Sequence, residues 1–88
     1  MSLSTKIREQ LINSFRAELV EHVQTMNDGL LALEQNRVKD KKERQEILEG
    51  IFRAAHSLKG ASRAVGVTVI EQVAHSLESV LDGLQKDT

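Results

Sequence analysis

The sequence predicts an all-α domain built as an antiparallel helical bundle, and three observations lead to this prediction. The 88 residues contain no proline and only two aromatic side chains, Phe15 and Phe52, whereas strands favour aromatic and β-branched residues. Apolar residues recur at steps of three and four, which is the spacing of amphipathic helices. Three such stretches, at about residues 4–36, 41–63 and 68–86, fill most of the chain. We therefore expect residues 1–88 to form a single domain.

Composition excludes several classes of function. The chain is 40% hydrophobic and 28% charged, which is typical of a soluble globular protein. It has no cysteine, which excludes disulfides, thiolate metal sites and thiol catalysis. No apolar run approaches the roughly 20 residues that a membrane span needs. The net charge of −1 provides no basic field to hold nucleic acid. We expect a cytoplasmic protein that binds neither nucleic acid nor membrane.

The first helix is expected over about residues 4–36 and should face the core along its whole apolar stripe. The weak helix formers Asn27, Asp28 and Gly29 interrupt it, but the stripe stays in phase across them, so one continuous helix is predicted. The stripe consists of Ile7, Leu11, Phe15, Leu19, Val23, Met26, Leu30 and Leu33.

Capping signals separate the second and third helices. A charged, solvated connector at residues 36–46 contains Asp40 and Glu43 at capping-box spacing, which predicts a helix start near Lys41. Gly66 can take the left-handed conformation that ends this helix, which we expect to reach about Arg63. Thr68 and Glu71 form a second predicted capping box. The expected buried residues are Ile47, Leu48, Ile51, Phe52, Ala55 and Leu58 in the second helix, and Ile70, Val73, Ala74, Leu77, Val80, Leu81 and Leu84 in the third.

Three histidines are the candidates for chemistry, and His56 has the most distinctive surroundings. Arg53, Lys59 and Arg63 share its helix face against few acidic residues, and this suits an anionic group on His56 or an acidic partner docking there. Gly60, one turn away, lets a partner backbone come close. We therefore predict a partner-binding face that includes Arg53, Gly60 and Arg63.

The short turn near residues 65 and 66 makes the last two helices antiparallel neighbours. His56 then lies level with His75. Because helical side chains lean toward their own N-terminus, Glu78 should reach the imidazole of His56. A carboxylate on one ring nitrogen fixes the tautomer and raises the basicity of the other nitrogen, as a nucleophilic histidine requires. Lys59 could balance the charge of a phosphoryl group bound there.

Residues 55–62 (AHSLKGAS) resemble the signature of histidine phosphotransfer (Hpt) domains, and residues 75–82 (HSLESVLD) resemble the matching segment of chemotaxis-type (CheA-like) histidine kinases. The resemblance covers roughly residues 4–86 and is nearest to the N-terminal domain of those kinases. It implies that His56 accepts the phosphoryl group, that Lys59 and Glu78 assist, and that His75 tunes the network.

The resemblance also implies the partners. The domain is expected to be a phosphoryl carrier and no enzyme by itself, with the parent chain a histidine protein kinase. An ATP-binding kinase domain would supply the phosphoryl group, and an aspartate of a response-regulator receiver domain would accept it. The chain has no phosphate-cradling loop and no metal-holding carboxylate cluster, so ATP and Mg²⁺ are assigned to the partners. We expect neither cofactor nor metal in this domain.

Two departures from the family stand out. Val65 and Val67 flank the turn glycine, where the family often has aromatic residues. The family bundle also has at least four helices, so we expect that the chain is truncated at its C-terminal side or that another copy supplies the fourth helix. Three helices would leave apolar stripes of the first and third uncovered. Association in solution, as a homodimer with helix exchange, is the expected result.

Three other functions stay open. The domain could be a free-standing carrier of a multistep phosphorelay, or a purely structural helical module for dimerisation. A metal-binding bundle using His22, His56 and His75 is the third alternative. Carboxylate-bridged metal bundles use Glu-x-x-His spacing, whereas Glu18 and His22 are four residues apart here.

Overall fold

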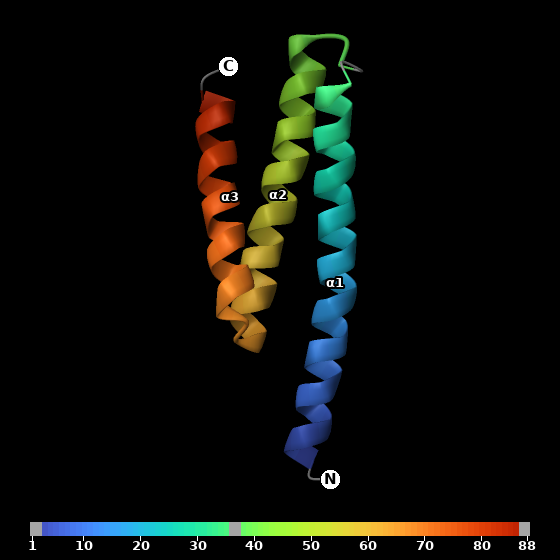
Figure 1. Ribbon diagram of the computed structural model, residues 1–88, viewed down its shortest axis with the longest axis vertical. Coiled ribbons are helices and arrows are strands. Elements are labelled where there is room, and N and C mark those ends of the chain that lie inside the picture. The colour runs from blue at the N-terminus through green and yellow to red at the C-terminus, as the bar shows by residue number, and fades with distance from the viewer. Residues whose placement is uncertain (1–2, 36–37, 87–88) are drawn as a thin grey trace.

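The computed structural model describes residues 3–35 and 38–86, which form three helices. Helix α1 spans Leu3–Glu34, α2 spans Lys41–Val65 and α3 spans Thr68–Lys86. Each helix runs antiparallel to the one before it, and α2 lies between the other two (Figure 1). The described ranges contain no strand, so the predicted all-α fold class is confirmed. They also contain no helix long and apolar enough to cross a bilayer.

The predicted start of α2 is confirmed by its N-cap. The side chain of Asp40 accepts a hydrogen bond from the backbone N–H of Glu43 at 2.8 Å. In return, the carboxylate of Glu43 accepts from the backbone N–H of Lys39 at 3.1 Å. The bond to Asp40 satisfies one of the N–H groups that a helix start leaves without helical partners, and the bond to Glu43 holds Lys39, the residue before the cap.

Helix α2 ends at Val65, two residues beyond the predicted end. It ends there because Gly66 takes the left-handed conformation that terminates a helix. Gly66 has φ 75°. Its N–H donates to the carbonyl of Arg63, and the N–H of Val67 donates to that of Ser62 at 2.9 Å. This is the Schellman arrangement, which satisfies the last carbonyls of a helix.

Helix α1 is continuous through Gly29, as predicted, although it ends at Glu34. The predicted end at Asn36 lies outside the described residues. Gly29 lies against α2, since a Cβ atom built there would be 2.7 Å from Cγ1 of Ile51. The missing side chain therefore lets the two helices pack closely.

The prediction of a capping box at the start of α3 is wrong, although the helix does span residues 68–86. The N–H of Glu71 donates to the carbonyl of Val67 at 3.1 Å, which makes Thr68 the first residue inside the helix. The carboxylate of Glu71 instead accepts a hydrogen bond from Nε of Arg63 on α2. A tertiary ion pair thus replaces the predicted local cap.

The hydrophobic core lies along α2, which contacts both other helices. Phe52 and Ile47, predicted to be buried, are half-buried at the edge of the core. The buried apolar residues are Phe15 and Met26 of α1, Leu48, Ile51, Ala54, Ala55 and Leu58 of α2, and Ala74 and Leu81 of α3.

The prediction that the whole stripe of α1 faces the core is wrong, because α1 and α3 each pack only on α2. No contact between α1 and α3 occurs among the described residues, and the N-terminal part of α1 extends beyond the ends of the other two helices (Figure 1). The expectation that three helices leave apolar stripes uncovered is confirmed. Exposed members of the predicted stripes are Ile7, Leu11, Val23 and Leu30 of α1, and Val73, Leu77, Val80 and Leu84 of α3.

Candidate functional site

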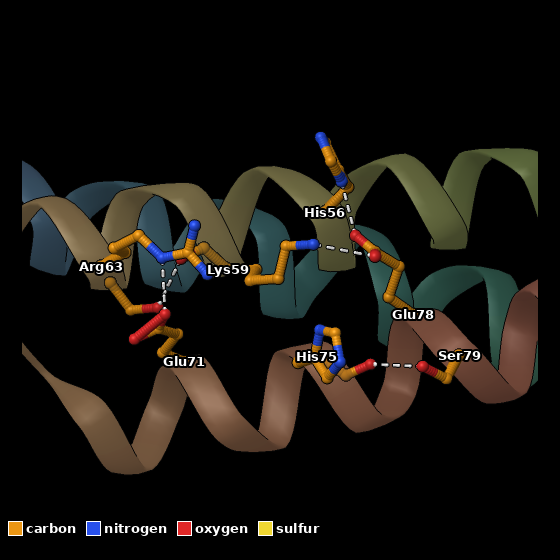
Figure 2. A network of polar contacts seen from close by, with 8 residues as sticks. His56, Lys59, Arg63, Glu71, His75, Glu78 and Ser79 are labelled. Carbon is orange, nitrogen blue, oxygen red and sulfur yellow. Dashed lines mark hydrogen bonds and ion pairs between the residues drawn. The ribbon is translucent and has the colours of Figure 1, made fainter.

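The candidate site lies on the face of α2 that meets α3. Helical spacing places Phe52, His56, Lys59 and Arg63 along one side of α2. The side chain of His56 is 63% exposed, and Figure 2 shows its ring projecting outward from the helix. Next to it in sequence, Ala55 is completely buried. The histidine therefore sits at the boundary between the core and water.

Glu78 of α3 contacts His56 as the sequence predicts. Its Oε2 lies 2.5 Å from Nδ1 of the imidazole, and its Oε1 accepts a hydrogen bond from Nζ of Lys59 at 2.9 Å (Figure 2). The side chains of Glu78 and Lys59 are only 16% and 17% exposed. The partial shielding strengthens both contacts relative to an ion pair in open water.

The carboxyl of Glu78 stays ionised over a wide pH range. The hydrogen bond from Lys59 lowers the pKa of Glu78, and the contact with His56 lowers it further. An ionised carboxylate can only accept hydrogen bonds, so Nδ1 of His56 carries a proton. The other nitrogen, Nε2, points away from Glu78 toward the outside of the bundle (Figure 2). A neutral imidazole held in this way has an accessible lone pair on Nε2.

His75 lies opposite His56 on α3 (Figure 2), as the turn position predicts. Its side chain is exposed. Its backbone carbonyl accepts a hydrogen bond from Oγ of Ser79 at 3.1 Å. In the part of the chain that the structure describes, the His75 ring makes no hydrogen bond or ion pair with His56, Lys59 or Glu78. The structure therefore brings three of the four predicted residues into one network.

The arginines of the predicted partner face both have acidic neighbours. Arg53 pairs with Glu49 at 2.5 Å on α2, and Arg63 pairs with Glu71 at 2.7 Å across to α3. The excess positive charge expected around His56 is therefore offset, since the prediction counted α2 alone and left out the acidic residues of α3. Both arginines are 71% exposed, so their outer edges still face solvent.

Gly60 leaves an opening on this face. A Cβ atom built at Gly60 would meet no atom within 4 Å outside its own helical turn. The space that the glycine leaves is thus open to solvent and is not filled by a neighbouring helix. This favours the predicted close approach of a partner over a packing role within the bundle.

Two residues near the site were not predicted to belong to it. The ring of Phe52 stacks against that of His56, with centroids 6.3 Å apart and planes at 12°. Spacing by four residues on a helix was the signal that could have revealed this pair. Ser62 is completely buried and donates from Oγ to the carbonyls of Leu58 and Lys59 at 2.8 and 3.0 Å. Such bonds satisfy a hydroxyl buried inside a helix bundle.

The alternative of a metal-binding bundle gains no support from the described residues. They contain no group of three or more histidine, cysteine, aspartate or glutamate side chains placed to hold a metal ion. His22 lies half-buried on α1, beside a shallow groove that it shares with Arg53 and Ser57. Within the described residues, His22 makes no hydrogen bond or ion pair with His56, Lys59 or Glu78.

Comparison with known proteins assigns the class. The family described as the Hpt domain matches residues 10–88. This range covers most of the chain, and the helical bundle with an exposed histidine on its central helix agrees with it. The chain belongs to the Hpt domain family.

Its relatives are chemotaxis proteins. The chain is 43% identical over 76 residues to the chemotaxis protein CheA of Bacillus subtilis (strain 168), which covers 86% of this chain and 11% of that protein. It is 38% identical over 77 residues to CheA of Listeria monocytogenes, covering 88% of this chain and 12% of that protein. The sensor histidine kinase CheAY of Helicobacter pylori is 28% identical over 78 residues, covering 89% of this chain and 9% of that protein. The chain is thus an Hpt phosphotransfer domain of the CheA type.

The chain spans 11% and 12% of the length of the first two of these relatives. No solved structure matches the chain significantly.

Proposed function

We propose that His56 carries a phosphoryl group between the ATP-binding domain of a chemotaxis-type histidine kinase and the receiver domain of a response regulator. The observation that supports this is the contact of 2.5 Å between Nδ1 of His56 and Oε2 of Glu78. The His56 side chain is 63% exposed in spite of this contact. One ring nitrogen is held by a carboxylate, and the other faces solvent. This arrangement suits a nucleophile that must be reached by large partners.

In the first step, the lone pair on Nε2 attacks the γ-phosphorus of ATP bound by the kinase domain. A P–N bond forms, the bond from the γ-phosphorus to the bridging oxygen breaks, and ADP leaves. The proton on Nδ1 stays in place, and the ionised carboxylate of Glu78 stabilises the positive charge that develops on the ring. ATP and Mg²⁺ are supplied by the kinase domain.

Lys59 has two roles in this proposal. Its ammonium donates to Oε1 of Glu78, the oxygen that does not contact Nδ1 of His56, at 2.9 Å, and so keeps the carboxylate ionised and oriented. It also places a positive charge near the incoming phosphoryl group, whose negative charge it partly offsets. His75 lies close enough on α3 to influence a phosphoryl group or a bound partner, and tuning of the network is its proposed role.

In the second step, an aspartate carboxylate of the receiver domain attacks the phosphorus. The P–N bond breaks, an acyl phosphate forms on the receiver, and the imidazole returns to its neutral form. The opening at Gly60 admits the receiver backbone, while the exposed edges of Arg53 and Arg63 contact acidic groups of the partner. Because this relay draws on ATP, we assign it to the cytoplasm.

Transfer of ³²P tests the role of His56. Wild type and His56→Gln are incubated with [γ-³²P]ATP and a CheA kinase domain, and label on the chain is measured. We expect label on wild type and none on the variant. His22→Gln is the matched control, since this half-buried histidine lies on α1 and, among the described residues, makes no hydrogen bond or ion pair with His56, Lys59 or Glu78, and it should be labelled like wild type. Equal labelling of His56→Gln and wild type would remove His56 from the role.

The parent protein is a second part of the proposal. We propose that the domain belongs to a longer kinase, because the relatives are CheA and CheAY proteins of which it spans a small part. A free-standing carrier is the alternative. The gene sequence distinguishes them: an ATP-binding domain in the same reading frame supports the kinase, and a stop codon directly after Thr88 supports the carrier.

A further inference from the structure

The ring of Phe52 lies nearly parallel to that of His56, one helical turn before it. The centroids are 6.3 Å apart and the planes differ by 12°. This separation and orientation lie within the range of favourable stacked aromatic pairs. Phe52 is itself half-buried and packs against the core, so its own ring has a supported position.

The contact with Glu78 restrains the imidazole only while their hydrogen bond is made. When that bond breaks, the ring turns about the Cα–Cβ and Cβ–Cγ bonds of its own side chain. Such a rotation would move Nε2 out of the direction from which a partner approaches. The side chain is 63% exposed, so water competes for Nδ1 and gives the ring further orientations.

We propose that Phe52 is a positioning residue that holds the plane of the His56 imidazole. The inference rests on the proposed function of His56. The phenyl ring limits rotation of the imidazole, and Glu78 limits the position of Nδ1. Together they keep Nδ1 on the carboxylate and Nε2 directed toward solvent. The residue acts on the reaction only through His56.

Like the carboxylate of Glu78, the phenyl ring of Phe52 favours positive charge on the imidazole. The face of an aromatic ring carries partial negative charge and attracts a cation. Charge builds up on the imidazole as the P–N bond forms, and the stacked ring favours that charged form. A leucine at this position would fill part of the same space but would supply neither the flat surface nor the negative face.

The test compares three variants of Phe52. Phe52→Leu and Phe52→Met keep an apolar side chain and lose the ring, whereas Phe52→Tyr keeps the ring. The first measurement is ¹⁵N NMR of the His56 ring, which reports the tautomer without any phosphorylation. We expect the Nδ1-protonated form to dominate in wild type and in Phe52→Tyr, and its population to fall in the other two variants.

The second measurement is the rate of ³²P labelling by a CheA kinase domain. We expect the rate to fall by roughly two- to tenfold in Phe52→Leu and Phe52→Met and to be recovered in Phe52→Tyr. Ile47→Val is the matched control, because Ile47 is another half-buried residue of α2 that packs on the core. It should lower the melting temperature without changing the tautomer or the labelling rate.

Two results would overturn the inference. The first is a wild-type tautomer population and labelling rate in Phe52→Leu and Phe52→Met. The second is an equal change in Ile47→Val, which would reduce Phe52 to a general packing residue. These outcomes can be told apart from a failure of the proposed function. His56→Gln tests that function, and the NMR measurement of the tautomer does not depend on it.

Discussion

At the scale of single residues, the site depends on one carboxylate with two partners. Glu78 contacts Nδ1 of His56 through one oxygen and Nζ of Lys59 through the other. The same group thus orients the imidazole and is itself oriented by a lysine. Removing its charge should affect the imidazole more than removing any single exposed charge nearby.

Glu78→Gln should slow phosphorylation of His56 by about ten- to hundredfold. This factor corresponds to the free energy that a hydrogen bond to a charged group contributes. The amide keeps the size of the side chain but supplies no negative charge to the developing imidazolium. The measurement is the initial rate of ³²P labelling.

Asp82→Asn is the matched control for this variant. Asp82 lies one turn further along α3 and pairs with Lys86 at 3.0 Å, whereas the carboxylate that contacts His56 is that of Glu78. Its labelling rate should stay at the wild-type value. An unchanged rate in Glu78→Gln would show that the contact with His56 serves packing alone.

The lowered pKa of Glu78 makes the stability of the fold depend on pH. The ordinary pKa of 4.5 applies in the unfolded chain, and the contacts with Lys59 and His56 lower the pKa in the folded chain. As the pH falls below 4.5, the unfolded chain takes up the proton first, so the free energy of unfolding decreases. The stability that the ionised Glu78 contributes is fully present above pH 4.5. It is lost once the pH has fallen below the pKa of Glu78 in the folded chain.

Urea denaturation at several pH values from neutral to about pH 3 measures this effect. The decrease on acidification should be smaller in Glu78→Gln than in wild type, because the variant has no carboxyl to titrate. Parallel curves for the two proteins would contradict the predicted role of Glu78.

The contact of His56 with Glu78 could be predicted from the sequence for a physical reason, whereas the bond from Lys59 to Glu78 was not predicted. A turn as short as that at Gly66 leaves little choice of register between α2 and α3, so the level of each residue follows from its number. The stacking of Phe52 and the pair of Arg63 with Glu71 were not predicted. Both contacts depend on which rotamer each side chain takes and on which neighbouring side chain it contacts. Residue spacing specifies neither.

At the scale of the helices, the closest approach of α1 and α2 depends on Gly29. Gly29→Ala should lower the free energy of unfolding by about 1–2 kcal/mol. The added methyl group would clash with Ile51, which is only 3% exposed and cannot move freely. This cost exceeds the gain of up to about 1 kcal/mol from the higher helix propensity of alanine. Urea denaturation gives the difference.

Gly83→Ala provides the control for helix propensity. A Cβ atom at Gly83 meets no atom within 4 Å, so the same substitution in α3 should raise stability by up to about 1 kcal/mol. Stabilisation by both substitutions would show that α1 and α2 can separate at Gly29 without cost.

Helix positions could be predicted closely, and the differences have local causes. The start of α2 follows from Asp40 and Glu43, which act over four residues. The end of α2 was predicted two residues early, because the pattern of apolar residues fades before Gly66 allows the turn. Thr68 was predicted to cap α3, but the pairing of Glu71 with Arg63 on another helix could not be seen from local spacing.

At the scale of the whole molecule, the bundle is an open layer of three helices measuring 54 × 20 × 16 Å. Because α1 and α3 meet only α2, each leaves apolar side chains in water. Val80 of α3 is 61% exposed and Leu11 of α1 is 53% exposed. The periodicity of the sequence identified these faces as apolar, and the count of three helices predicted that part of them would stay uncovered.

The exposed faces predict that copies of this chain associate in solution, because burying apolar surface is favourable by about 25 cal/mol per Å². Sedimentation equilibrium should show an apparent mass that rises with concentration above that of a 9.8 kDa monomer. Val73→Lys together with Val80→Lys, both at exposed positions on α3, should reduce the association. A monodisperse monomer at high concentration would contradict this prediction.

The accessible nitrogen of His56 would impose an order on the partners of the proposed relay. Nδ1 is occupied by Glu78, so donor and acceptor must both reach Nε2, and both must approach it from the same side of the bundle. In the proposed relay, the kinase domain and the receiver domain would therefore exclude one another and have to bind in turn. An excess of receiver domain should inhibit loading of the histidine competitively, even when that receiver lacks its acceptor aspartate.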